Sequence, residues 1–419
     1  MENNIKDNID NPENLEQFYQ SDKKSFTKAF NDIYSEISVL KIAEFWKIRL
    51  EFDSKKIGLN AIKKTDIWFL ILISFLALFL IKIPQIFDIQ LNEELFYVRN
   101  AGLIVLFALS IYLFLTKKSL EFPKIGVSLI IFVVSAIYIN LLPIGTQSDS
   151  INLAYIHLPL MLWCLYGIIF IDFNFTDKLK RIDYIKYNGD LAILGAVILI
   201  AGGILAAVTI GLFSAIDINI EKFYMNYFGI WGLVSAPIVA TFIIKNYSFV
   251  TNKIAPIIAN IFSPLVLITL IVYLITISIA GKDPYTDRNF LIVFNLMLLG
   301  VMAIIVFSVS ETSNNKKQRF NEMILFILSI VTLIIDLVAI SAIIYRLGEF
   351  GFTPNRTAVL GSNLLIFGNL ILIMLDLYRV NFNNLEISKV ELRIGKYLPI
   401  YILWTIFVVF VFPFIFGLK

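Results

Sequence analysis

The stretch EMILFILSIVTLIIDLVAISAIIY, residues 322–345, is a long apolar run with Asp336 as the one charged residue in its interior. A helix needs about 20 apolar residues to cross the hydrocarbon core of a bilayer. Backbone amides cannot stay unpaired in lipid, so such a run must be helical in a membrane. The stretch therefore predicts a membrane-spanning helix, and the rest of the chain decides whether it stands alone or belongs to a bundle.

The composition of the whole chain favours a bundle. Of 419 residues, 58% are hydrophobic and 16% are charged. Soluble domains carry roughly 25% charged and about 45–50% apolar residues. This sequence has too few polar residues to cover the surface of a globular protein of its size, which excludes that class. The net charge of +3 is small and forms no basic stripe, so no nucleic-acid partner is predicted.

Apolar runs of similar length recur along the chain. They lie at about 66–87, 100–115, 125–143, 154–173, 190–213, 228–246, 262–280, 289–310, 322–345, 357–378 and 398–417. Lys and Arg are retained in short loops on the cytoplasmic side, and here they gather in every second loop. We therefore predict an all-α, polytopic transmembrane helical bundle over residues 66–419, with about eleven spans, a cytoplasmic N terminus and an outward C terminus.

Two segments precede the first run. Residues 1–22 are rich in Asn, Asp and Glu, which predicts a disordered N-terminal tail. In residues 23–65, apolar positions recur at helical spacing from Phe26 to Leu40, which predicts a cytoplasmic amphipathic helical segment. Such a segment can lie on lipid headgroups or against the bundle, or it can dock a protein partner. Both interpretations stay open.

Asp336 is the first candidate for a functional site. An ionisable residue deep in a span is costly and is a functional candidate by default. At a rise of 1.5 Å per residue, Asn363 and Asn369 of the following run lie at a similar depth. One interpretation is an ion or proton site within the bundle. The other is a structural polar pair that joins two helices.

A distinctive loop follows this run at residues 345–356, with the sequence YRLGEFGFTPNR. Arg346, Glu349 and Arg356 put two cations and one anion at an outward-facing mouth. They fit either a binding mouth for an anionic ligand or a tight, ion-paired connector. His157, near the outer end of the fourth run, is a further candidate at this mouth, as a structural histidine or as a proton-relay residue.

The fifth run carries a row of small residues. Gly203, Ala207 and Gly211 are spaced by four, so they form one smooth face on a helix. Close packing against another helix is the expected use of such a face.

Other kinds of chemistry find little support. The chain has one cysteine, Cys164, and one histidine, His157, which excludes an internal disulfide and predicts no metal site. No nucleotide loop, HExxH motif or GxSxG motif is present. We predict no cofactor, and an enzyme would need a catalytic group assembled from separate loops.

Several segments carry a family resemblance. They are FSAI at 213–216 with IEKFY at 220–224, API at 236–238, GFTPNR at 351–356, YLPIY at 397–401 and FP at 412–413. Through them the C-terminal half of the chain resembles a bacterial family of multi-pass membrane proteins named domain of unknown function 4153. The resemblance implies a place in the bacterial cytoplasmic membrane, and it transfers no catalytic residue.

Two functional hypotheses follow from the sequence. The first is a transporter or channel-like protein with a polar site around Asp336. The second is a non-catalytic membrane scaffold or sensor that engages a cytoplasmic partner through residues 23–65. The predicted partners are the lipid bilayer and either a small solute or a protein that the sequence does not identify.

Overall fold

The computed structural model describes residues 2–38, 40–57, 64–87, 93–117, 121–143, 148–214, 219–247, 263–272, 274–275, 279, 285, 288–312 and 319–417. Every regular element in these ranges is a helix, and they contain no strand. The chain divides into two compact units, Met1–Ile67 and Trp68–Lys419. The predicted all-α, polytopic helical bundle is confirmed.

The first unit contains α1 (Glu2–Asp7), α2 (Pro12–Ser21), α3 (Lys23–Ile37) and α4 (Lys41–Ile57). Residues 2–21 differ from the expected disordered tail, because α1 and α2 pack on the helices that follow. Ile5, Leu15 and Tyr19 are buried in one core with Phe26 and Trp46. A few well-spaced apolar side chains are enough to fold this polar segment onto the amphipathic face of α3 and α4.

The polar residues that suggested disorder instead cap these helices. The side chain of Asn11 accepts a hydrogen bond from the backbone N–H of Asn14 at the start of α2. Asp22 accepts one from the N–H of Ser25 at the start of α3. Replacing such an N-cap typically costs about 1 kcal/mol. Asn and Asp therefore favour order here, where composition alone indicated its absence.

Ten helices in the described part of the chain are long and apolar enough to cross a membrane. They are α5 (Lys64–Ile81), α7 (Glu93–Leu115), α8 (Phe122–Leu141), α9 (Asp149–Phe170), α10 (Lys178–Ser214), α12 (Ile230–Asn246) with the short α11 (Glu221–Tyr224) and a π-helical turn (Met225–Gly229) before it, α14 (Arg288–Thr312), α15 (Arg319–Phe350), α16 (Pro354–Phe382) and α17 (Ile387–Phe410). Each predicted run except 262–280 coincides with one of them. That run extends over residues outside the described ranges, and its described part contains the apolar helix Ser263–Val272.

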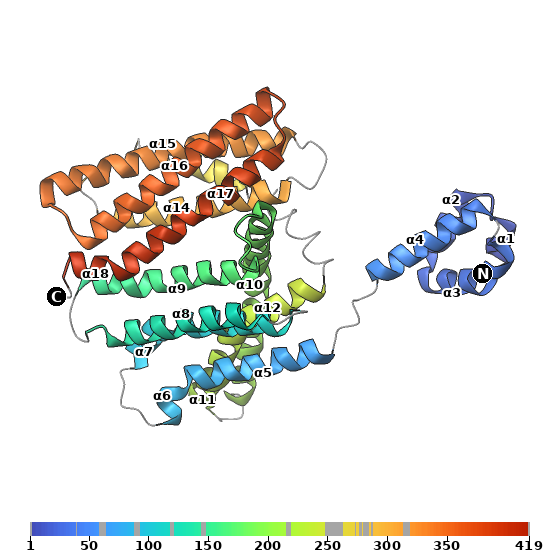
Figure 1. Ribbon diagram of the computed structural model, residues 1–419, viewed down its shortest axis with the longest axis horizontal. Helices are drawn as coiled ribbons and strands as arrows, with labels where there is room; N and C mark the ends of the chain where they lie inside the picture. The colour runs from blue at the N-terminus through green and yellow to red at the C-terminus, as the bar shows by residue number, and fades with distance from the viewer. Residues whose placement is uncertain are drawn as a thin grey trace. The chain divides into compact units, whose positions relative to one another are not determined.

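The C-terminal helices form a large apolar core. Figure 1 shows α15, α16 and α17 gathered together in orange and red. Apolar side chains of α14, α15, α16 and α17 meet there, with Leu298, Leu328 and Leu370 fully buried. A second core joins α7, α8 and α9, and α17 reaches it through Val409. The arrangement places the middle of α15, and hence Asp336, inside packed protein.

The small residues of α10 do not meet another helix in the described structure. A Cβ added at Gly195, Gly202 or Gly203 finds no described atom within 4 Å. Close packing is therefore not observed at Gly203 among the described residues, and the surroundings of Gly211 lie outside them. α10 packs through its first half instead, where a Cβ on Gly189 would lie 1.9 Å from the ring of Phe307 in α14.

Candidate functional site

Asp336 lies at the middle of α15 and is 0% exposed. Its neighbours Ile335 and Ala339 belong to the apolar core of the C-terminal helices. Neither carboxylate oxygen has a hydrogen-bond partner among the described residues. Burying a carboxylate without a partner costs several kcal/mol. Within the described part of the chain, the fold therefore leaves a buried carboxylate whose charge no side chain compensates.

The two asparagines predicted to face Asp336 have other partners. Asn363 Nδ2 donates to Asn295 Oδ1 of α14 at 2.8 Å. Asn369 Nδ2 donates to the hydroxyl of Tyr401 of α17 at 3.0 Å. Asp336 is close enough to Tyr401 to interact with it electrostatically. The structure thus groups Asp336 with Tyr401 and Asn369, and it places Asn363 in a separate pair.

Several polar atoms in this group are hydrogen-bond acceptors that lack a described donor. Asn369 Oδ1 is buried without a partner, as are both oxygens of Asp336. All three are acceptors, because an ionised carboxylate and an amide oxygen have no proton to donate. A proton on Asp336, a small cation or an ordered water would satisfy them. The pattern is what a cation-binding or proton-binding position requires, and an apolar structural contact would not produce it.

The residues predicted in an outward loop lie mostly on helices, with Arg346 and Glu349 in the last turns of α15 and Arg356 in the first turn of α16. α15 continues to Phe350, so only residues 351–353 link it to α16. Gly351 has φ of 73°, a left-handed conformation that suits glycine after a helix end. Arg356 donates to the carbonyls of Phe350 and Gly351 at 2.7 and 2.8 Å, and the guanidinium of Arg346 lies 5.9 Å from the Phe350 ring centroid. Glu349 is exposed.

His157 has a local backbone partner. Its Nδ1 lies 2.9 Å from the carbonyl oxygen of Leu153, one turn earlier in α9. With Nδ1 as the donor, this bond fixes the tautomer and leaves Nε2 as an acceptor. The geometry fits a structural histidine, and no described contact joins it to Arg346, Glu349 or Arg356.

A cavity of about 300 Å³ opens where one end of α9, α10 and α12 meets the end of α7. The C-terminal ends of α7, α9 and α12 and the first half of α10 surround it. Its lining combines four aromatic rings with charged side chains. The lining residues are Tyr112, Leu113, Thr116, Tyr166, Phe170, Asp183, Lys186, Tyr187, Asp190, Thr241, Ile244 and Lys245.

A chain of hydroxyl groups runs along this cavity. Thr241 Oγ1 donates to the carbonyl of Pro237 at 2.7 Å. The Tyr187 hydroxyl lies 2.7 Å from Thr241 Oγ1, and the Tyr166 hydroxyl lies 2.8 Å from that of Tyr187. Each hydroxyl has one proton, so Tyr187 must donate to Thr241 and Tyr166 must donate to Tyr187. None of these three hydroxyl groups therefore has a proton left to donate to a ligand.

Three buried carboxylates lie beside the cavity on three different helices. Asp190 of α10 and Glu311 of α14 are each 9% exposed, and Glu391 of α17 is buried as well. Lys186 lies 3.8 Å from Glu391 and also interacts electrostatically with Asp190 and Glu311. Neither Asp190 nor Glu311 has a hydrogen bond or an ion pair to a described residue. Lys186 thus interacts with all three carboxylates.

Sequence reasoning missed this acidic group. Asp190 and Glu311 lie at the ends of apolar runs, and Glu391 lies seven residues before the last run, where a charge is normally a solvated loop residue. The sequence signal was weak: all three acids lie on the side that the Lys and Arg pattern assigns to the cytoplasm. Only the packing of α10 against α14 and α17 shows that the three converge.

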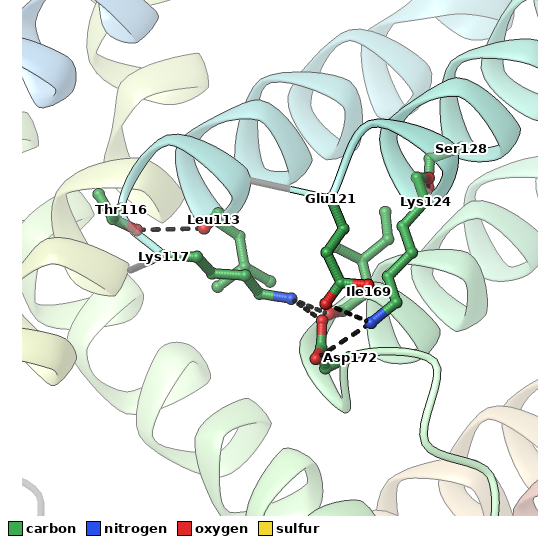
Figure 2. Close-up of polar contacts among 8 residues, drawn as sticks. All are labelled: Leu113, Thr116, Lys117, Glu121, Lys124, Ser128, Ile169 and Asp172. Carbon is green, nitrogen blue, oxygen red and sulfur yellow. Dashed lines mark hydrogen bonds and ion pairs between the residues drawn. The ribbon is translucent and has the colours of Figure 1, made fainter. Parts of the chain in front are cut away.

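A cluster of ion pairs joins the C-terminal ends of α7 and α9 to the start of α8, as Figure 2 shows. Lys117 Nζ lies 2.9 Å from Asp172 Oδ1 and donates to the carbonyl of Ile169, also at 2.9 Å. Lys124 bridges Asp172 and Glu121 at 3.2 and 2.8 Å. The hydrogen bond from Lys117, with help from Lys124, lowers the pKa of Asp172 below its ordinary value of 3.8.

Replacing Asp172 with asparagine should therefore give a small, pH-dependent loss of stability. A carboxylate whose pKa is lowered by folding stabilises the protein above its unfolded pKa and loses that contribution as the pH falls through the folded value. The side chain is 41% exposed, so solvent screens the pairs. We expect the melting temperature to fall by about 1–2 °C at pH 7. Thermal scans of both proteins from pH 7 to pH 3 should converge, and a constant difference across this range would contradict the prediction.

Asp376, near the C-terminal end of α16, is the counterpart of Asp336. It is equally buried but fully paired. Arg393 of α17 donates to both of its oxygens, and Arg379 donates to Oδ1 at 3.3 Å. Bidentate arginine–carboxylate pairs hold two elements in a fixed orientation. This aspartate is structural, and the contrast shows that the fold pairs buried acids where it can.

No group of three or more potential side-chain metal ligands is found in the described part of the chain. The resemblance to the domain of unknown function 4153 family stays a prediction. Comparison with protein-family models, with curated proteins and with solved structures finds no match, so the site is interpreted from its own geometry.

Proposed function

We propose that this multi-pass membrane protein is a proton-coupled transporter in which Asp336 takes up and releases the proton. The observation that carries the proposal is the pair of buried, unpartnered oxygens on Asp336 in the middle of α15. A carboxylate held in packed protein without a basic partner has an energetic reason to bind a proton. Tyr401 interacts with Asp336 electrostatically, and Asn369 donates a hydrogen bond to the Tyr401 hydroxyl.

A proton fits this position better than a metal cation. A hard cation needs several oxygen ligands at once, whereas a proton needs only one carboxylate oxygen. The described neighbourhood offers three oxygens without a described partner and the Tyr401 hydroxyl, whose oxygen already accepts a hydrogen bond from Asn369. Alternation between protonated and ionised forms would favour different packings of α15, and this coupling is what transport requires.

Charge movement in reconstituted protein tests the proposal. Proteoliposomes on a solid-supported membrane should give a transient current after a pH jump, and Asp336→Asn should reduce it at least tenfold. Asp149→Asn, an exposed carboxylate at the start of α9, should leave the current unchanged. Equal currents from wild type and Asp336→Asn would contradict the proposal. A current driven by sodium at constant pH would assign the site to a metal cation.

The orientation follows from the loop charges and is part of the proposal. We place the N terminus in the cytoplasm of a bacterial cell and the C terminus outside. Green fluorescent protein fused to the C terminus should then be dark in a bacterium, because it folds poorly after export in unfolded form. The same reporter at the N terminus should be bright. A bright C-terminal fusion would reverse the assignment of the two faces.

A second candidate function rests on the first unit. α4 buries Ala43, Trp46 and Leu50 in the core of this unit, yet Phe45 and Ile48 on another face are 57% and 56% exposed. A folded helical unit with an exposed apolar pair suits a scaffold or sensor that binds a cytoplasmic partner. Substituting both residues with serine should abolish partner binding and leave the pH-jump current intact.

A further inference from the structure

We propose that the cavity between α7, α9, α10 and α12 binds a small organic cation with an ammonium group. This site lies apart from Asp336 and does not depend on the transport proposal. Asp190 provides the main argument. It lines the cavity, is nine-tenths buried, and has no hydrogen bond or ion pair to a described residue. A buried carboxylate that faces a cavity without a partner needs a positive charge to balance it.

A second carboxylate lies at the rim of the cavity. Asp183 also lines the cavity and is exposed. Asp183 and Asp190 are seven residues apart, two turns along one face of α10, or about 10 Å. A cation would therefore meet one carboxylate at the mouth and a second in the interior. Glu311 adds a further negative charge behind Asp190, at a distance where the two interact electrostatically.

The walls of the cavity favour a cation over an anion or a hydrogen-bond acceptor. The faces of aromatic rings attract ammonium groups, and the rings of Phe170 and Tyr187 pack with centroids 5.0 Å apart. The hydroxyl protons of Tyr166, Tyr187 and Thr241 are all used within the protein, so these oxygens can only accept.

The helix ends around the cavity also favour a bound cation. The C-termini of α7, α9 and α12 converge there, and a helix C-terminus carries a partial negative charge that favours cations. The protein's own ammonium groups already use this property. Lys245 donates to the carbonyl of Thr116 at 2.8 Å, and Lys117 donates to that of Ile169 at 2.9 Å.

The two lysines in the lining do not make this an anion site. Lys186 lies 3.8 Å from Glu391, and Lys245 is bound to the Thr116 carbonyl. Lys245 is therefore engaged by a backbone carbonyl, and Lys186 forms its ion pair with Glu391 while it acts on Asp190 only electrostatically, so the negative charge of Asp190 is balanced in part. The volume of about 300 Å³ is at the small end for ligand cavities, which suits a compact head group such as trimethylammonium.

Choline and its neutral carbon isostere, 3,3-dimethylbutanol, test the inference on the intact purified protein. Calorimetric titration should show that choline binds at least tenfold more tightly than the isostere. Asp190→Asn should weaken choline binding at least tenfold, and Asp183→Asn should weaken it less. Asp149→Asn at the other end of α9 should bind like wild type.

The comparison of the two ligands on wild-type protein needs no variant, so it decides the matter even where Asp190→Asn fails to fold. Equal affinity for choline and its isostere would overturn the inference, as would unchanged binding in a folded Asp190→Asn protein. Binding of inorganic phosphate that is lost in Lys245→Gln would replace the cation site with an anion site. None of these outcomes depends on the pH-jump current assigned to Asp336.

Discussion

Asp376→Asn should lower the free energy of unfolding by about 2–3 kcal/mol, while Asp336→Asn should leave it unchanged or raise it slightly. Both aspartates are buried in the C-terminal helices. Removing one partner of a buried ion pair costs about 3–5 kcal/mol, because the other charge is left uncompensated. The side chains of Arg393 and Arg379 are 40% and 54% exposed, so water relieves part of that cost.

Asp336 should respond in the opposite direction because it has no hydrogen-bond partner to lose among the described residues. An unpartnered buried polar group costs about 1–3 kcal/mol. An amide of the same shape removes the charge and keeps the packing. Residues retained at a cost to stability are typical of functional sites. A gain in stability together with a loss of the pH-jump current would therefore identify Asp336 as functional.

Thermal or denaturant unfolding in detergent measures both variants under one condition. A double-mutant cycle supplies the control: Asp376→Asn should cost much less in an Arg393→Gln background, since the pair is already broken. Equal destabilisation by Asp336→Asn and Asp376→Asn would show that Asp336 has a structural partner. That result would remove the main support for the transport proposal.

Hydropathy and loop charge predicted most of the architecture. The run at 322–345 corresponds to α15 (Arg319–Phe350), and the structure extends it at both ends. Apolar length decides such elements almost alone, because lipid leaves the backbone no alternative to a helix. The N-terminal tail differed because four apolar side chains, not average composition, determine whether a short polar segment folds. Ile5, Leu15, Phe18 and Tyr19 pack there against α3 and α4.

The candidate sites were harder to predict, because the position of a residue along a helix does not show which neighbouring helix its side chain faces. Asp336 and Asn363 have similar depths, yet Asn363 faces α14 and bonds Asn295. A rotation of about 100° per residue separates positions that lie at almost the same height. Asp190, Glu311 and Glu391 raised the same difficulty from three helices at once. Which helices are neighbours is a property of tertiary packing, and no single run encodes it.

Gly361→Ala should destabilise the protein by about 1–2 kcal/mol through a clash between α16 and α17. A Cβ on Gly361 would lie 1.9 Å from the indole of Trp404. That ring is held by a hydrogen bond of 3.0 Å from its Nε1 to Ser362 Oγ and by edge-on packing with Phe412. Overpacking a well-filled contact costs about 1–3 kcal/mol, and the better helix propensity of alanine returns up to about 1 kcal/mol.

Gly203→Ala in α10 is the matched control, because a Cβ there meets no described atom within 4 Å. With no clash, only the propensity term remains, so its melting temperature should stay level or rise. Trp404→Phe should rescue Gly361→Ala, since the smaller ring vacates the space that the new methyl group needs. Equal losses at Gly361 and Gly203, or no rescue by Trp404→Phe, would show that the contact between α16 and α17 does not depend on this glycine. The rescue experiment therefore tests the packing that positions Tyr401 next to Asp336, since Tyr401 and Trp404 lie one turn apart on α17.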